Sequence, residues 1–273
     1  ITTTIITILT SLIFAVLMYA FLMRHDLRRV IKIWFMLVVL LAIGITIYPF
    51  ISQYTAYPSL IALILVAPLV YFKILKPNVY VHNITELFIY PGIAVVVVVL
   101  LYLPDNEIAS VFIAILLLIL ISIYDAWAVW KSGIMQKMAK YQMEELNIFG
   151  GFLLPTMSKK DKAKLKLLRQ KYKNKKKIPK EVKSKKFKVN MAILGGGDVI
   201  FPIITAGVFM WSYAEQTFLG IPGLLPALFV ISGAFGGLVY LFMNTQKGKA
   251  YPAMPYITSG IFVAILLWRL VTL

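Results

Sequence analysis

Long apolar runs, each near the length of a helix that crosses a lipid bilayer, dominate the sequence. Such a helix needs about 20 predominantly apolar residues. The runs predict eight membrane-spanning helices, at Ile1–Leu22, Ile31–Phe50, Tyr57–Phe72, Ile84–Leu103, Ile108–Trp130, Met191–Ala214, Leu224–Met243 and Pro255–Leu273. No repeat of about 20–50 residues is visible along the chain. The pattern therefore predicts an all-α polytopic membrane protein.

One long stretch without a span, residues 131–190, divides the chain into three parts. Residues 1–130 hold the N-terminal membrane helices, and residues 191–273 form a C-terminal unit of three membrane helices. The first half of the connecting loop ends in Phe149-Gly150-Gly151-Phe152, and its mixed polarity favours an interfacial helix. The second half, from Ser158 to Lys188, is rich in lysine. We expect this half to be a solvated and partly disordered linker that is attracted to anionic lipid.

The composition excludes several classes of protein. Hydrophobic residues make up 60% of the 273 residues and charged residues 14%, whereas about a quarter of the residues in a soluble domain are charged. These values exclude a soluble enzyme and a disordered protein. The chain has no cysteine, which excludes thiol catalysis, thiolate metal sites and a disulfide scaffold.

Basic residues follow every second predicted helix. The formal charge of +17 comes mainly from residues 131–188, which hold 19 of the 28 Lys and Arg. The other loops with Lys or Arg follow the first, third and seventh runs, and the intervening loops contain none. Because cytoplasmic loops retain Lys and Arg, we expect the basic loop 131–190 in the cytoplasm, Ile1 and Leu273 outside, and no binding of nucleic acid. A chain that begins at an apolar isoleucine also predicts a further span upstream.

Two acidic residues, Asp125 and Asp198, lie inside predicted spans. The other acids lie in loops or near helix ends, including Glu86, which is expected in the first turn of its helix, where a carboxylate suits the helix dipole. A carboxylate at the centre of a span costs roughly 2.5–3.5 kcal/mol on insertion scales, and no Lys or Arg lies at the same depth. At about 1.5 Å per residue, Asp125 and Asp198 lie roughly 9 and 15 Å from the cytoplasmic ends of their helices. We therefore expect the two carboxyls to face one another.

Short motifs surround both acids. Asp198 follows Gly195-Gly196-Gly197, which loosens a helix and permits a close approach of another backbone. The last predicted span begins with Pro252-Ala253-Met254-Pro255, whose two prolines keep the backbone extended. Tyr124 precedes Asp125, and its hydroxyl could reach a neighbouring carboxyl, although packing is the commoner role. Taken singly, these features also fit helix packing, loop punctuation or proton-carrying acids.

In combination, the motifs resemble those of a known family. Ile123-Tyr124-Asp125, Gly195-Gly196-Gly197-Asp198 and Pro252-Ala253-Met254-Pro255 are similar, in order and spacing, to the motifs of the presenilin and signal peptide peptidase family of intramembrane aspartyl proteases. That family carries Tyr-Asp, Gly-x-Gly-Asp and Pro-Ala-Leu, so Met254 stands here in place of a leucine. The resemblance covers nearly the whole chain. It implies a presenilin-like fold of nine spans, with one missing at the N-terminus, and the presenilin orientation.

The resemblance also implies a reaction. The protein would be an intramembrane aspartyl endopeptidase that hydrolyses peptide bonds within the transmembrane helices of other membrane proteins. Asp125 and Asp198 would share a proton. The ionised carboxyl would activate a water molecule, and the protonated one would donate a hydrogen bond to the scissile carbonyl. Tyr124, Gly195–Gly197 and Pro252–Pro255 would support the site and bind the substrate. We expect activity in the cell membrane without a cofactor, a metal or obligatory partner subunits.

Two alternatives remain open on the sequence. A prepilin-peptidase-like protease shares Gly-x-Gly-Asp but lacks the Tyr-Asp and the terminal proline motif. A cation or proton transporter, or a leak channel, could use Asp125 and Asp198 as ion sites, although such proteins favour broken helices in both halves of the chain. Neither His25 nor His82 belongs to an H-E-x-x-H zinc motif.

Overall fold

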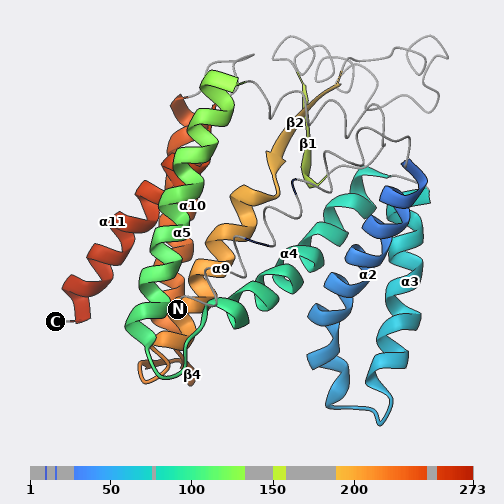
Figure 1. The fold of residues 1–273 in the computed structure, drawn as a ribbon, viewed down its shortest axis with the longest axis horizontal. Helices are drawn as coiled ribbons and strands as arrows, with labels where there is room; N and C mark the ends of the chain where they lie inside the picture. The colour runs from blue at the N-terminus through green and yellow to red at the C-terminus, as the bar shows by residue number, and fades with distance from the viewer. Residues whose placement is uncertain are drawn as a thin grey trace, which may run out of the picture.

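The computed structural model describes residues 28–75, 78–132, 150–157, 189–244 and 251–272, together with Thr10 and Val16. Within these ranges the chain forms seven α-helices, one π-helical turn and two antiparallel pairs of strands (Figure 1). The helices are α2 (Arg28–Ser52), α3 (Pro58–Leu75), α4 (Val79–Leu101), α5 (Glu107–Trp127), the π-helical turn η1 (Ala128–Ser132), α9 (Gly197–Ser212), α10 (Leu224–Asn244) and α11 (Met254–Thr272). The strands are β1 (Gly151–Met157), β2 (Val189–Gly195), β3 (Thr217–Phe218) and β4 (Ile221–Pro222).

Six of the seven helices are long and apolar enough to cross a membrane, and α9 is shorter, with 16 residues. The six coincide with the second to fifth and the last two of the expected spans. The described part of the chain is thus mostly helical, as expected of a polytopic membrane protein, with six of the eight expected spans present as long apolar helices. The first expected span, Ile1–Leu22, lies outside the described residues except for Thr10 and Val16.

Asparagine residues set the beginning of two helices. The Asn78 side chain accepts a hydrogen bond from the backbone amide of Tyr80 at 2.9 Å, and the Asn106 side chain accepts one from Ala109 at 3.0 Å. Such caps satisfy amides that have no partner within the helix. Because Asn78 caps α4, this helix begins five residues before the expected Ile84. Glu86 therefore lies about two turns inside α4, and the prediction that placed it in the first turn is wrong.

The helices pack in an order that brings α5 and α9 together. Helices α2 and α3 form a hairpin, and α4 runs obliquely from this hairpin towards α9 (Figure 1). Helix α9 packs against α4, α5 and α10, and α11 packs against α10 and α5. The α2–α3 and α4–α5 linkers lie at the lower end in Figure 1, as do β3 and β4, whereas β1 and β2 lie towards the upper end. The two helices that carry the buried acids are therefore direct neighbours.

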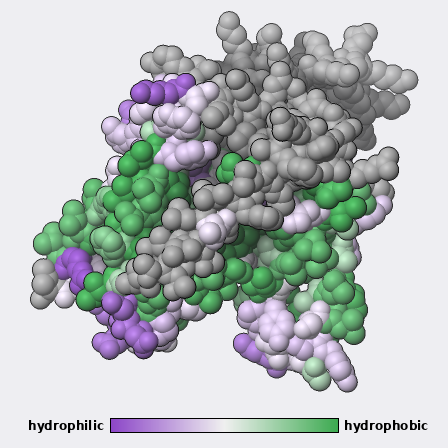
Figure 2. Space-filling view, in the orientation of Figure 1, coloured by the Kyte–Doolittle hydropathy of each residue, from purple (hydrophilic) through white to green (hydrophobic). Residues whose placement is uncertain are grey.

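The outer surface of the helices is apolar. In Figure 2, hydrophobic side chains cover the middle of the helices, and hydrophilic side chains gather near the helix ends. Leu60, Phe112, Phe235 and Leu266 are among the many large apolar side chains that the fold leaves exposed. An apolar surface of this extent marks contact with another apolar phase, and a lipid bilayer is the phase that suits helices of this length.

The expected span Met191–Ala214 is wrong in its first part. The chain up to Gly195 forms β2, which pairs with β1 from Gly151 opposite Gly195 to Met157 opposite Val189. Glycine is a poor helix former, and pairing with β1 gives the backbone groups partners outside a helix. The expected interfacial helix is also wrong at Gly151 and Phe152, which begin β1. The rest of the expected loop helix, residues 133–149, and the lysine-rich residues 158–188 lie outside the described residues.

Candidate active site

Asp125 lies near the end of α5 and is almost fully buried, with 4% of its surface exposed. Its Oδ2 atom accepts a hydrogen bond from the backbone amide of Met254 at 3.0 Å, and the backbone amide of Ala253 also contacts the carboxyl. One turn earlier, the Ser122 and Thr258 hydroxyls are 2.6 Å apart. These contacts hold the first turn of α11 against the last turn of α5.

Asp198 lies in the first turn of α9, directly after the strand-to-helix junction. Its carboxyl is partly buried and contacts the backbone amide of Gly195. The charge of Asp125 acts on Asp198, so the two carboxyls lie within electrostatic reach of one another. Among the described residues, neither carboxyl forms an ion pair with Lys or Arg. The fold thus brings together the two acids that the sequence identified.

The three glycines before Asp198 form the end of β2 and the beginning of α9. A Cβ atom on Gly195 would lie 3.1 Å from the Asp198 carboxyl, and one on Gly196 would lie 3.2 Å from the Tyr90 hydroxyl. A Cβ atom on Gly197 would meet only the Phe201 ring, at 3.4 Å. Space is therefore tight at the first two positions, where the backbone passes close to polar side chains.

The proline motif lies against Asp125, but its backbone differs from the prediction. Pro252, Ala253 and Met254 are buried, and α11 begins at Met254. The expected extended backbone is therefore wrong at Met254 and Pro255. Proline is tolerated in the first helical turn because an amide at that position has no partner within the helix. The amides of the two residues before Pro255 are free to point at the Asp125 carboxyl.

Tyr124 does not join the two acids. Its side chain is 53% exposed, and its ring lies 6.2 Å from that of Trp127, on the outer side of α5. The tyrosine within electrostatic reach of Asp198 is Tyr90 of α4, whose phenol interacts more strongly with Glu86 than with Asp198. The spacing of His82, Glu86 and Tyr90, four residues apart within one apolar helix, is the sequence signal that could have identified it.

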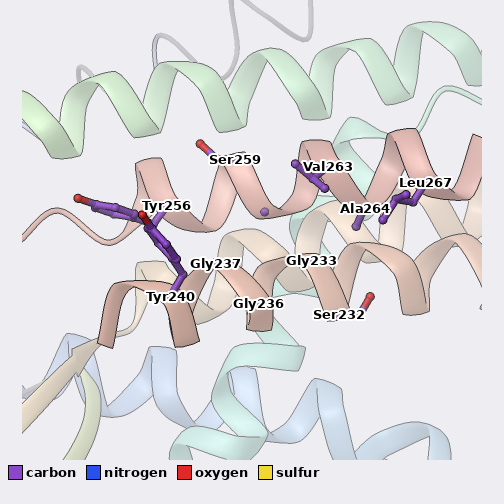
Figure 3. Close-up of a pocket in the computed structure, with 11 residues that line it drawn as sticks. Ser232, Gly233, Gly236, Gly237, Tyr240, Tyr256, Ser259, Val263, Ala264 and Leu267 are labelled. Carbon is purple, nitrogen blue, oxygen red and sulfur yellow. The ribbon is translucent and has the colours of Figure 1, made fainter. Parts of the chain in front are cut away.

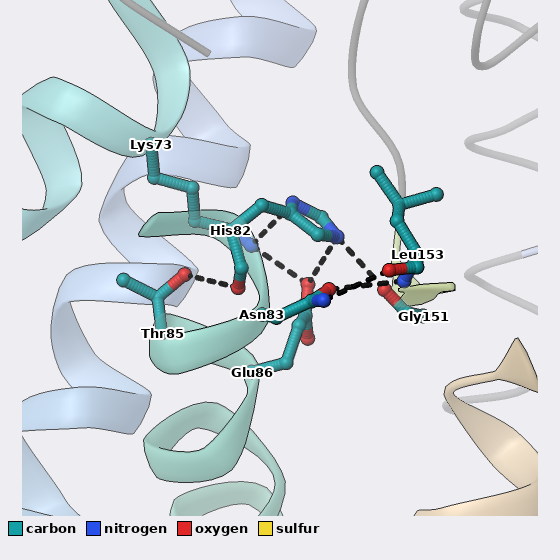
Figure 4. Close-up of polar contacts among 7 residues, drawn as sticks. All are labelled: Lys73, His82, Asn83, Thr85, Glu86, Gly151 and Leu153. Carbon is teal, nitrogen blue, oxygen red and sulfur yellow. Dashed lines mark hydrogen bonds and ion pairs between the residues drawn. The ribbon is translucent and has the colours of Figure 1, made fainter. Parts of the chain in front are cut away.

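A buried polar cluster, which the sequence analysis missed, lies between α3, α4 and β1 (Figure 4). Lys73 Nζ donates a hydrogen bond to Glu86 Oε1 at 2.7 Å and lies 3.1 Å from His82 Nδ1. His82 Nε2 lies 2.8 Å from the carbonyl oxygen of Gly151 in β1. Lys73 was expected in a loop after the third span and Glu86 at a helix end. Both are instead buried within their helices and neutralise one another.

A groove of about 550 Å³ runs along α10 and α11 (Figure 3), and neither Asp125 nor Asp198 lines it. Its lining contains glycines, two serines, two tyrosines and apolar side chains, with no charged residue. The lining residues are Ser232, Gly233, Gly236, Gly237, Tyr240, Tyr256, Ser259, Gly260, Val263, Ala264 and Leu267. The groove is therefore separate from the site around Asp125 and Asp198.

Comparison with known proteins gives one family. A family model described as signal-peptide peptidase, presenilin aspartyl protease matches residues 1–272. Searches of curated proteins and of solved structures found no match. The family match covers almost the whole chain, including both buried acids and the motifs around them.

Proposed function

The chain belongs to the signal-peptide peptidase and presenilin family of aspartyl proteases, and from this premise we propose that Asp125 and Asp198 are its catalytic pair. The protein is an integral membrane protein, and the family consists of intramembrane aspartyl proteases that act on transmembrane substrates. The observation that carries the proposal is that these two carboxyls lie within electrostatic reach of one another, on the adjacent helices α5 and α9, with no cation paired to either among the described residues. Two neighbouring acids without a cation are better suited to activating a water molecule than to forming a structural ion pair.

The proposed reaction begins with one proton shared between the two carboxyls, because two like charges so close together cannot both form cheaply. The ionised carboxyl takes a proton from a water molecule, and the resulting hydroxide attacks the scissile carbonyl. The protonated carboxyl donates a hydrogen bond to the carbonyl oxygen and later a proton to the leaving nitrogen. Between the two acids, Asp125 has the more fixed position, because backbone amides of the proline motif hold it.

The substrate of the proposed reaction is a transmembrane helix of another protein, part of which must unwind before attack. A helix hides its carbonyls in its own hydrogen bonds, so an unwound segment needs new partners for its backbone. The backbone of β2 at Gly195 is extended, lies next to Asp198 and can supply such partners by strand addition. The amides of Ala253 and Met254 already contact Asp125, so the proline motif serves this acid. Family membership and the strand conformation up to Gly195 support this role.

The proposed topology follows the distribution of charge. The protein lies in the cell membrane, with the basic loop 131–190 on the cytoplasmic side and Leu273 on the outer side. The chain comprises the N-terminal helices 1–130, this loop and the C-terminal unit 191–273. It acts without an obligatory partner subunit. Labelling of single cysteines introduced into this chain, which has none of its own, would test the sidedness directly.

The catalytic pair is tested with a fluorogenic transmembrane peptide in proteoliposomes. Asp125→Asn and Asp198→Asn keep the volume of each side chain but remove its acid–base chemistry, so each should reduce cleavage to background while the thermal unfolding temperature stays close to wild type. Glu107→Asn, at an exposed helix end, is the control and should cleave like wild type. Cleavage near the wild-type rate by either aspartate variant would show that the pair is wrong.

A further inference from the structure

One face of α4 carries a line of polar groups that ends at the candidate active site. His82, Glu86 and Tyr90 are spaced four residues apart and are all buried, so they lie on one face of the helix. Helix α4 packs against α9, which begins at the Gly195–Gly197 turn. The line therefore runs from the buried polar cluster with Lys73 to Asp198.

The end of this line at His82 and Glu86, away from Asp198, is held in place by several contacts. Lys73 supplies the counter-charge of Glu86 at 2.7 Å. Asn83, next to His82, donates to the Leu153 carbonyl at 2.8 Å and accepts from the Leu153 amide at 2.9 Å, which fastens β1 to α4 (Figure 4). Because β1 pairs with β2 up to Gly195, the same contacts hold the strand that leads into the turn before Asp198.

Tyr90 occupies the inner end of the line. Only 3% of its surface is exposed. Its ring packs edge-on against the Phe152 ring of β1, with the ring centroids 5.4 Å apart. Its hydroxyl lies where a Cβ atom on Gly196 would be only 3.2 Å away. The phenol interacts most strongly with Glu86, to which it makes a loose hydrogen-bonding approach, and more weakly with the charge of Asp198, yet its oxygen meets strict hydrogen-bond geometry with no group in the described part of the chain.

A buried hydroxyl without a hydrogen bond costs roughly 1–3 kcal/mol, so Tyr90 needs an acceptor. Glu86 is the partner that the Tyr90 hydroxyl approaches in the structure, but its Oε1 atom already accepts a hydrogen bond from Lys73 and lies 3.4 Å from His82 Nε2. Among the residues that the structure describes, Asp198 contacts one backbone amide, that of Gly195, and a carboxyl can accept several hydrogen bonds. Asp198 therefore has more capacity for a further hydrogen bond than Glu86.

We propose that Tyr90 is a positioning residue of the protease, whose ring supports the Gly195–Gly197 turn and whose hydroxyl donates a hydrogen bond to the Asp198 carboxyl. This inference rests on the proposed function of Asp198. The hydroxyl orients the carboxyl towards Asp125 and the water between them. Because Tyr90 acts through Asp198, its loss affects the rate of the chemical step and leaves substrate binding unchanged.

The test is Tyr90→Phe in the full chain, which keeps the ring and removes only the hydroxyl. With a fluorogenic transmembrane peptide in proteoliposomes, kcat should fall about tenfold while KM stays within about twofold. Tyr80→Phe, on the same helix and 79% exposed, is the matched control and should behave like wild type. Unfolding temperatures measured for both variants show whether the ring alone maintains the fold.

The outcomes separate this inference from the proposed function. If wild type cleaves, Asp198→Asn does not, and Tyr90→Phe keeps the wild-type kcat, the role of Tyr90 is wrong and the catalytic pair stands. A raised KM at unchanged kcat would mean that Tyr90 contacts substrate, which also overturns the positioning role. If Asp198→Asn cleaves like wild type, both proposals fail.

Discussion

The backbone amide of Met254 donates a hydrogen bond to the carboxylate of Asp125, across 129 positions of sequence and 3.0 Å of space. The contact joins the proline motif directly to a buried acid, so the motif sets the position of a carboxyl. A backbone donor is available from any residue except proline. The side chain at position 254 therefore matters for how α11 packs, and the amide matters for how Asp125 is oriented.

The effect of replacing Met254 on stability and cleavage should depend on the volume of the new side chain and not on its chemical type. The side chain is 2% exposed and belongs to the core shared by α5, α9, α10 and α11. Met254→Leu nearly conserves volume and should keep cleavage within about twofold of wild type, whereas Met254→Ala leaves a cavity that costs roughly 2–5 kcal/mol. Thermal unfolding in detergent and the peptide assay measure both effects.

A matched control for Met254 is Met243→Ala at a methionine of α10 that is 80% exposed. This substitution should leave unfolding unchanged, because it opens no cavity. Equal losses for Met254→Ala and Met243→Ala would contradict the packing argument.

The six long helices could be predicted from the sequence, and the two acids could be identified as candidate site residues, because both depend on simple rules. An apolar run of sufficient length has one stable form in lipid, and an unpaired acid inside such a run is rare enough to indicate a function. Helix ends were less predictable, since Asn78 moved the beginning of α4 away from the edge of the apolar run. The β1–β2 pair could not be predicted, because its two strands depend on contacts between distant segments.

The polar cluster escaped the sequence analysis for a related reason. Lys73 was assigned to a loop and Glu86 to a helix end, and only the packing of α3 against α4 shows that they meet. Tyr124 was expected to support the site because it precedes Asp125, yet neighbouring residues of a helix point to different faces. Tyr90, far away in sequence, lies nearer to the site. Adjacency in space, more than adjacency in sequence, decides which tyrosine serves the acids.

Removing one member of the buried ion pair should destabilise the protein more than removing both. Glu86→Gln leaves the Lys73 ammonium buried without its counter-charge, at a cost of roughly 3–5 kcal/mol. The double variant Lys73→Met with Glu86→Leu buries no charge and should unfold at a higher temperature than Glu86→Gln. Glu107→Gln, at an exposed position of α5, is the control for loss of a glutamate. A double variant less stable than Glu86→Gln would mean that the pair itself stabilises the fold.

Alanine at Gly196 should lower activity through crowding alone. The backbone of Gly196 has φ −62° and ψ −35°, which alanine adopts freely. The added methyl would lie 3.2 Å from the Tyr90 hydroxyl and 3.3 Å from its ring, so the ring must move by a few tenths of an ångström. We expect a loss of kcat of about threefold to tenfold. Gly44→Ala, in α2 with nothing within 4 Å of the added methyl, should keep wild-type kinetics, and a loss of equal size there would contradict the crowding argument.

Two adjacent glycines of α10 should respond in opposite ways to alanine. A Cβ atom on Gly237 would overlap the backbone oxygen of Tyr256 in the first turn of α11, whereas one on Gly236 meets nothing within 4 Å. Backbone cannot rotate away as a side chain can, so Gly237→Ala must push α11 outward and stretch the hydrogen bond from Met254 to Asp125. It should lower both the unfolding temperature and kcat, while Gly236→Ala gains up to about 1 kcal/mol from helix propensity. If the two variants had the same unfolding temperature and the same kcat, the close packing of α10 against α11 would have no part in holding Asp125.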